Sequence, residues 1–109
     1  MVNPRYAAGA KLEYKMRDYL LSKGYTCVRS AGSKGAVDIV GWNTKHMILM
    51  QCKREKKKTT YTDDVARLRD VRVIPGTVRV LAVAHKGVVE FRDVDTGQIT
   101  MMSMKEMNG

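Results

Sequence analysis

Two strand-like segments joined by a tight turn restrict the fold of this chain more than any other feature. Residues 36–42 (AVDIVGW) and 46–53 (HMILMQCK) flank the turn Asn43-Thr44-Lys45, which is the arrangement of a β-hairpin. The MILM run in the second segment is apolar at successive positions, so both faces of that strand must be covered. The hairpin therefore predicts a central strand in a sheet that carries packed layers on both sides.

The remaining segments supply those layers and complete the sheet. Helical spacing of apolar residues predicts one helix over residues 10–23, capped by Gly24, and a second that begins with Thr62 as its cap and is ended by Pro75. Four more apolar segments predict strands, at residues 25–30, 78–84, 88–94 and 98–104. This order predicts an α/β fold of one domain over residues 1–109, with a central mixed β-sheet flanked by helices.

The charge balance indicates a polyanionic partner. The chain has 20 Lys and Arg against 11 Asp and Glu, a net charge of +9. Cys27 and Cys52 lack the spacing of a zinc site or a disulfide framework, so we expect reduced core thiols. The N-terminus has charges where a signal peptide is apolar, and the longest apolar run, residues 47–50, is too short for a membrane span. We expect an intracellular, cytoplasmic protein with no membrane partner, or one of the host cytoplasm if it is viral.

Polar side chains interrupt the hairpin at one end. Because strand side chains alternate, Gln51 and Lys53 share one face while Cys52 points to the other. Asp38 lies in the partner strand, opposite Met50 or Gln51 depending on the length of the turn. A buried carboxylate is costly unless it is paired, and a bound cation would relieve that cost. The alternative interpretation is that Asp38 is a paired structural residue.

Glu13 is a fourth polar residue that we place at this centre. On the first predicted helix it lies three residues before Met16 and seven before Leu20, at the margin of the apolar stripe, so it should lean toward the sheet. Carboxylate, amide and main-chain carbonyl oxygens form a hard ligand set suited to Mg²⁺ or Mn²⁺. With 2 histidines in the chain, zinc is disfavoured. An ordinary solvated helix glutamate is the alternative for Glu13.

Three ordered segments resemble a known family. GAKLE at residues 9–13, VRSAGSKGAVDIVG at 28–41 and QCKREKK at 51–57 are similar to the archaeal and viral Holliday junction resolvases, a branch of the PD-(D/E)XK nuclease superfamily. The resemblance implies a restriction-endonuclease-like core. It also implies a structure-specific DNA endonuclease that resolves four-way junctions by metal-dependent hydrolysis of symmetry-related strands, and a homodimer.

The resemblance assigns roles to individual residues. Glu13, Asp38, Gln51 and the main-chain carbonyl of Cys52 would hold the metal ion, with Gln51 at the position usually held by a second acidic ligand. Lys53 would be the superfamily lysine, and Ser30 would lie near the scissile phosphate. Gln51 departs from the pattern, since an amide removes one negative charge.

A second departure lies just before Glu13, where such resolvases carry an arginine and this chain has Ala7 and Ala8. Arg5, Lys11 or Arg17 would have to replace it. The residues expected to contact DNA are Arg5, Lys11, Arg29, Ser33, Lys34, Arg54, Lys56, Lys57 and Lys58. The alternative interpretation of the basic run after residue 53 is a solvated loop without a binding role. The second helix and the C-terminal strands are the candidate dimer surface.

Two other functions remain open at this point. The chain could be another nuclease of the superfamily that acts on flaps, nicks or linear duplex. It could also be a catalytically silent nucleic-acid-binding relative in which Gln51 reflects loss of the metal site. Cleavage tests on branched and linear DNA separate these alternatives.

Overall fold

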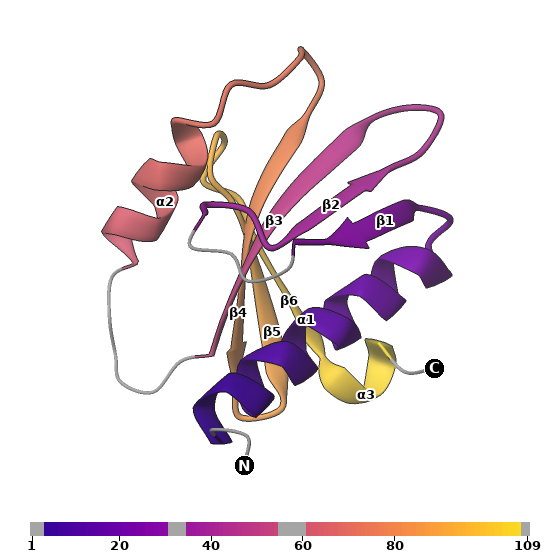
Figure 1. Cartoon of the computed structure of the whole chain (residues 1–109), viewed down its shortest axis with the longest axis vertical. Helices are drawn as coiled ribbons and strands as arrows, with labels where there is room; N and C mark the ends of the chain where they lie inside the picture. Colours follow the sequence, from indigo (N-terminus) through magenta and orange to yellow (C-terminus); the bar gives the residue numbers. More distant parts are fainter. Residues whose placement is uncertain (1–3, 31–34, 55–60, 108–109) are drawn as a thin grey trace.

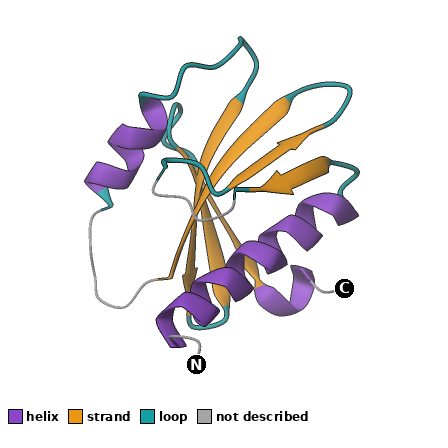
Figure 2. Cartoon of the chain, in the orientation of Figure 1, coloured by secondary structure: helices purple, strands orange, loops and turns teal. Residues whose placement is uncertain are grey.

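The computed structural model describes residues 4–30, 35–54 and 61–107. Within these residues the helices are α1 (Pro4–Ser22), α2 (Thr62–Arg69) and α3 (Met104–Met107). The strands are β1 (Thr26–Arg29), β2 (Ile39–Trp42), β3 (Met47–Arg54), β4 (Val78–His85), β5 (Val88–Asp93) and β6 (Ile99–Ser103). Figure 2 shows these strands as one twisted sheet with helices on its flanks. The predicted α/β fold with a mixed central sheet is confirmed.

The order of strands across the sheet is the order along the chain, β1 to β6. Neighbouring strands are antiparallel except β3 and β4, which are parallel. A parallel pair requires a crossover connection, and α2 lies within it. The C-terminal ends of β3 and β4 therefore lie at the same edge of the sheet, where Gln51 and Lys53 pair with Leu81 and Val83.

Each face of the sheet carries its own hydrophobic cluster. On one face α1 contributes the buried residues Leu12, Met16 and Leu20. On the other face α2 contributes Leu68, which is fully buried. Successive residues of β3 divide between the two clusters: Met50 joins the α1 side and Leu49 the α2 side. Figure 1 shows the two helices on different sides of the strands, so β3 is the predicted central strand.

The hairpin and the first helix end as the sequence predicts. In the β2–β3 turn the Asn43 side-chain oxygen accepts the main-chain amides of Lys45 and His46 at 2.8 and 2.9 Å. After α1, Gly24 has φ of +89° and the Tyr25 amide donates to the Leu20 carbonyl at 3.1 Å, the pattern of a glycine C-cap.

Several predicted boundaries are wrong. Helix α1 begins at Pro4 rather than at residue 10, because residues 4–9 have no apolar stripe to reveal a helix that their alanines favour. Strand β1 covers 26–29 rather than 25–30, and β2 begins at Ile39 rather than at residue 36. Strand β6 ends at Ser103 and leads into α3, which the sequence did not indicate.

The second helix also differs from its prediction. Thr62 is its first residue rather than its cap; Tyr61 holds the N-cap position with φ of 53° and no side-chain capping hydrogen bond. The helix ends at Arg69, well before Pro75. The Arg79 guanidinium holds the chain there, donating to the Arg69 carbonyl at 2.7 Å. This long-range contact replaces the proline as the reason for the end.

Candidate active site

Asp38 lies where the β2–β3 ladder ends, directly before β2, and hydrogen bonds link it to β3 and to the residue after β1. Only 7% of it is exposed. Its amide donates to the Met50 carbonyl, and its own carbonyl accepts the Ser30 amide, both at 2.8 Å. Its Oδ2 accepts the Cys52 amide at 2.8 Å. The carboxylate is therefore held against β3. The ladder pairs Met50 with Ile39, and Asp38 lies just outside the ladder with its amide bonded to that same Met50 carbonyl.

The Cys52 thiol lies within electrostatic reach of both predicted acids. Burial raises the pKa of Cys52 well above its usual value, and the negative charges of Asp38 and Glu13 raise it further. Both carboxylates therefore lie close enough to Cys52 to act on it electrostatically. Glu13 approaches from α1 and Asp38 from the end of β2, so the helix acid and the strand acid converge on one residue of β3.

Glu13 is half-buried and already paired. Its Oε1 accepts a hydrogen bond from Nε of Arg29, the last residue of β1, at 3.0 Å. The Arg29 guanidinium also lies 4.4 Å from the centre of the Tyr14 ring. The lean of Glu13 toward the sheet is as predicted. Arg29, predicted as a DNA contact, is in this structure the partner of a site carboxylate.

Gln51 and Lys53 point toward the α2 side of β3. The Gln51 Oε1 atom is buried and finds no hydrogen-bond partner among the described residues. The Lys53 ammonium lies 3.3 Å from Oδ1 of Asp64, in the first turn of α2. The structure thus places Glu13 and Asp38 near Cys52, whereas Gln51 and Lys53 lie on the opposite face of β3.

This donor set fits a hard divalent cation. The Asp38 carboxylate and the Gln51 amide are oxygen donors, and a buried amide oxygen without a partner is uncommon in a protein unless a ligand completes it. Within residues 4–30, 35–54 and 61–107 no group of three or more His, Cys, Asp or Glu could hold a metal. A cation here would therefore need Gln51, water or main-chain oxygens as well. The Cys52 carbonyl remains such a prediction.

The sequence profile of the family described as archaeal Holliday junction resolvase (Hjc) matches residues 4–106. The chain belongs to the Hjc family. The crossover junction endodeoxyribonuclease Hjc of Methanocaldococcus jannaschii is 29% identical over 89 residues, which cover 80% of this chain and 66% of that protein. The chain thus matches slightly less than two thirds of that relative's length.

A solved Hjc structure has the same fold. The Archaeoglobus fulgidus Hjc, described as a Holliday junction resolvase from an archaeal hyperthermophile, superposes with a TM-score of 0.62 at 20% sequence identity. The alignment covers 93% of this chain and 88% of that one. The Hjc architecture therefore extends over almost the whole chain, including the C-terminal half where the sequence resemblance is weakest.

The other predicted site and DNA-contact residues that the structure describes lie on α1 and at the ends of β1 and β3. Ser30 is exposed and directly follows β1, and the hydrogen bond that its amide donates to the Asp38 carbonyl places its main chain beside Asp38. Lys11 is exposed on α1, while Arg17 pairs with Asp18. Arg54 is exposed at the end of β3. Arg5 belongs to α1. Four lysines and one serine predicted to contact DNA lie outside the described residues: Ser33, Lys34, Lys56, Lys57 and Lys58.

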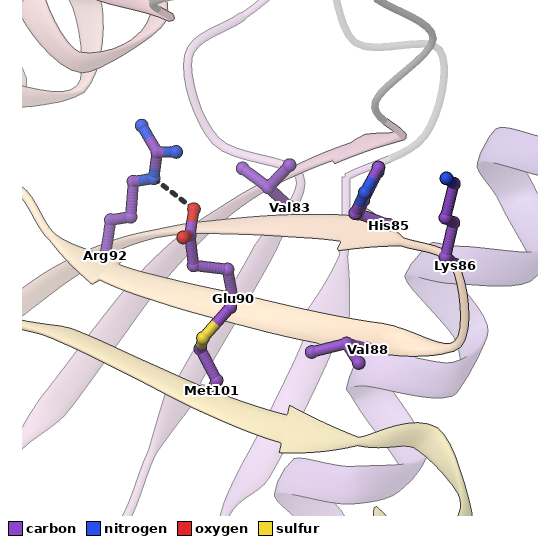
Figure 3. A pocket seen from close by; sticks show the side chains of 7 residues that line it. All are labelled: Val83, His85, Lys86, Val88, Glu90, Arg92 and Met101. Atoms are coloured by element: carbon purple, nitrogen blue, oxygen red, sulfur yellow. Dashed lines mark hydrogen bonds and ion pairs between the residues drawn. The ribbon is translucent and has the colours of Figure 1, made fainter. Parts of the chain in front are cut away.

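A hollow of about 200 Å³ lies on the same face as Lys53. The registers lead to it across the sheet, because Lys53 pairs with Val83, Val83 with Glu90, and Glu90 with Met101. Figure 3 shows Val83, Glu90 and Met101 around the hollow, with cationic or titratable side chains beside them: His85, Lys86 and Arg92. The site and this hollow therefore form one continuous face of the molecule.

Asp64 is the residue at this centre that sequence reasoning missed. Asp63 and Asp64 both lie in the first turn of α2, where a negative charge is favourable whichever way it points. The signal that separates them is helical spacing: Asp64 lies four residues before the buried Leu68 and so shares its sheet-facing side, whereas Asp63 is exposed.

No helix in the described part of the chain is long and apolar enough to cross a membrane.

Proposed function

We propose that this chain is a magnesium-dependent endodeoxyribonuclease that resolves four-way DNA junctions, with Mn²⁺ able to substitute. The observation that carries the proposal is the Asp38 carboxylate, buried at the end of a strand pair and hydrogen-bonded to the amide of Cys52, the residue between Gln51 and Lys53 in β3. Membership of the Hjc family supports the choice of substrate. The names of the two Hjc relatives support it as well.

The chain's own groups have separate tasks in this reaction. Asp38, Glu13 and Gln51 would hold the cation, which when bound polarises phosphoryl oxygens and lowers the pKa of a water. Lys53 places a positive charge where negative charge develops on the phosphate. Ser30, beside Asp38, would contact the scissile phosphate through its hydroxyl or amide. The buried position of Asp38 keeps its carboxylate fixed during the attack.

The DNA path would run along the sheet edge where β3 and β4 end. Arg54 closes β3 and pairs in register with Ala84, which directly precedes His85 and Lys86. The exposed cations of this edge would bind backbone phosphates and read no bases. The net charge of +9 agrees with such a partner. Shape, rather than sequence, would then select the junction.

We also propose a homodimer, because a four-way junction offers two symmetry-related strands and a two-fold dimer offers two identical sites. The exposed apolar residues Ile99 and Met101 on β6, 52% and 67% exposed, support the predicted C-terminal strand surface as the contact. Strand β6 is also an outermost strand of the sheet, so a second copy has access to its unpaired side.

A substrate comparison tests the function. The protein is incubated with labelled four-way junction, flap, nicked duplex, linear duplex and single strand, each with Mg²⁺, Mn²⁺ or chelator. We expect paired cuts in opposite arms of the junction with either metal, little cleavage of linear duplex, and no cleavage in chelator. Equal cleavage of junction and linear duplex would instead favour a less selective nuclease. Tight junction binding without cleavage in either metal would favour a silent binding relative.

A further inference from the structure

The Lys53 ammonium is held by a residue from a different element. Its Nζ lies 3.3 Å from Oδ1 of Asp64, and 36% of the Lys53 side chain is exposed against 16% for Asp64. Lys53 is near the end of β3, and Asp64 is in the first turn of α2. Because both side chains are partly shielded from water, their attraction is screened less than that of a surface pair.

The carboxylate is the fixed member of the pair. Asp64 lies one helical turn before Leu68, which is fully buried in the α2-side cluster and anchors the helix on the sheet. Arg67 approaches the same Oδ1 at 3.4 Å from the next turn. Lys53, by contrast, carries its charge on a flexible four-carbon stem. The position of the ammonium is therefore set by where α2 places Asp64.

Lys53 needs such a partner because its own strand does not provide one on this face. Gln51 lies two residues earlier on the same side of β3, but a neutral amide cannot balance an ammonium charge. Asp38 is bonded through Oδ2 to the Cys52 main chain. The acid that contacts Lys53 thus comes from α2, across the connection that makes β3 and β4 parallel.

We propose that Asp64 is a positioning residue for Lys53, which fixes the ammonium on the α2 side of β3, two residues along that strand from Gln51. The inference rests on the proposed nuclease function. Asp64 acts on the reaction only through Lys53, so its removal should slow cleavage with little effect on DNA affinity. A misplaced catalytic group can cost as much as about a hundredfold in rate.

Asp64→Asn tests the proposal, with Asp63→Asn as the matched control at the neighbouring, exposed position. In single-turnover cleavage of a four-way junction, we expect Asp64→Asn to lower the rate constant by about tenfold or more while the junction Kd changes less than about threefold. Asp63→Asn should cleave at the wild-type rate. Equal rates for Asp64→Asn and wild type would overturn the proposal.

A double-mutant cycle separates positioning from a general effect on folding. In a Lys53→Met background, Asp64→Asn should cause no further loss of rate, because its effect passes through Lys53. Asp64→Glu, which retains the charge on a longer side chain, should recover part of the rate. If the two losses multiply instead, Asp64 acts independently of Lys53 and the proposal is wrong.

A measurement on metal-free protein does not depend on cleavage. The acetylation rate of Lys53 is followed by mass spectrometry in chelator, and we expect it to rise several-fold in Asp64→Asn but not in Asp63→Asn, because the ion pair protects the amine. An unchanged rate would show that Asp64 does not hold Lys53. If wild type cuts no substrate, the nuclease function fails, while this modification rate still reports on the ion pair.

Discussion

At the scale of single residues, Gln51 is the most unusual member of the site, because it is a neutral amide where an acidic ligand is expected. Its buried Oε1 has no hydrogen-bond partner within the described residues, although burial of an unpaired amide oxygen costs free energy. The neighbouring acids Asp38 and Glu13 both act on Cys52, so a third carboxylate at position 51 would add like-charge repulsion in the absence of metal. The amide thus lowers the charge of the metal-free site at the expense of cation affinity.

Gln51→Glu should reverse that balance. We expect the Mn²⁺ dissociation constant to fall by about tenfold, close to 1.4 kcal/mol, with junction cleavage retained. The same change should lower Tm in chelator, because three carboxylates then share the site. Calorimetric Mn²⁺ titration and thermal unfolding measure both effects, with the exposed Gln98→Glu as control. Weaker metal binding together with loss of cleavage would argue against a ligand role for Gln51.

The raised pKa of Cys52 makes stability depend on alkaline pH. The unfolded chain loses the thiol proton above about pH 8.5, whereas the folded chain keeps it because burial and two carboxylates disfavour the thiolate. The free energy of unfolding should therefore fall by about 1.4 kcal/mol per pH unit above that point, from this one group. Denaturation of wild type and Cys52→Ala between pH 8 and 10 measures the difference. Parallel curves for the two proteins would refute it.

At the scale of elements, the sequence predicted the turn and the helix end that short-range contacts determine. The β2–β3 hairpin follows from Asn43 at its turn, and the end of α1 follows from Gly24. The start of α2 could not be predicted this way, because Tyr61 takes the cap position in a left-handed conformation without a capping side chain. Its end depends on Arg79, a contact distant in sequence.

The candidate site likewise has residues whose placement local patterns predict and one contact that they do not predict. Alternation along β3 placed Gln51 and Lys53 on one face, and the apolar stripe of α1 placed Glu13 toward the sheet. The Lys53–Asp64 pair could not be predicted because it depends on how α2 packs across the sheet. That packing is fixed by burial of Leu68, which no pattern within β3 reveals.

Leu68→Ala should show how far α2 depends on this single anchor. The residue is fully buried, so we expect the free energy of unfolding to fall by about 3 kcal/mol. Because Asp64 is on the same helix, single-turnover cleavage should slow as well. Chemical denaturation gives the first value, with Ile74→Ala, at a 66% exposed position, as a control that changes stability by less than about 0.5 kcal/mol. A similar loss in both variants would contradict the packing argument.

At the scale of the whole molecule, the arrangement of the sheet concentrates the functional groups at one edge. The parallel pair β3–β4 brings the end of β3, with Lys53 and Arg54, beside the turn that carries Lys86. The hollow next to Val83 extends the same face toward β6 (Figure 3). The opposite edge carries the β2–β3 turn with Lys45. A DNA partner is therefore expected to use the first edge and not the second.

Salt dependence of junction binding measures which edge is used. If about six phosphates are neutralised, log K should fall against log salt with a slope near −5, about 0.9 per contact. Lys86→Ala should make this slope shallower by about 0.9, whereas Lys45→Ala should leave it unchanged. Fluorescence anisotropy in chelator at several salt concentrations gives the slopes. The assignment of the binding edge is wrong if Lys45→Ala has the larger effect.

The central claim is that Asp38 anchors a cation-dependent phosphodiesterase site, and the single-turnover rate of Asp38→Asn on a four-way junction tests it most directly. Asparagine keeps an oxygen that can accept the Cys52 amide, so the fold and junction affinity should be nearly unchanged. We predict that cleavage in Mg²⁺ falls by about a hundredfold or more. A folded Asp38→Asn protein that cuts the junction at the wild-type rate would contradict the account.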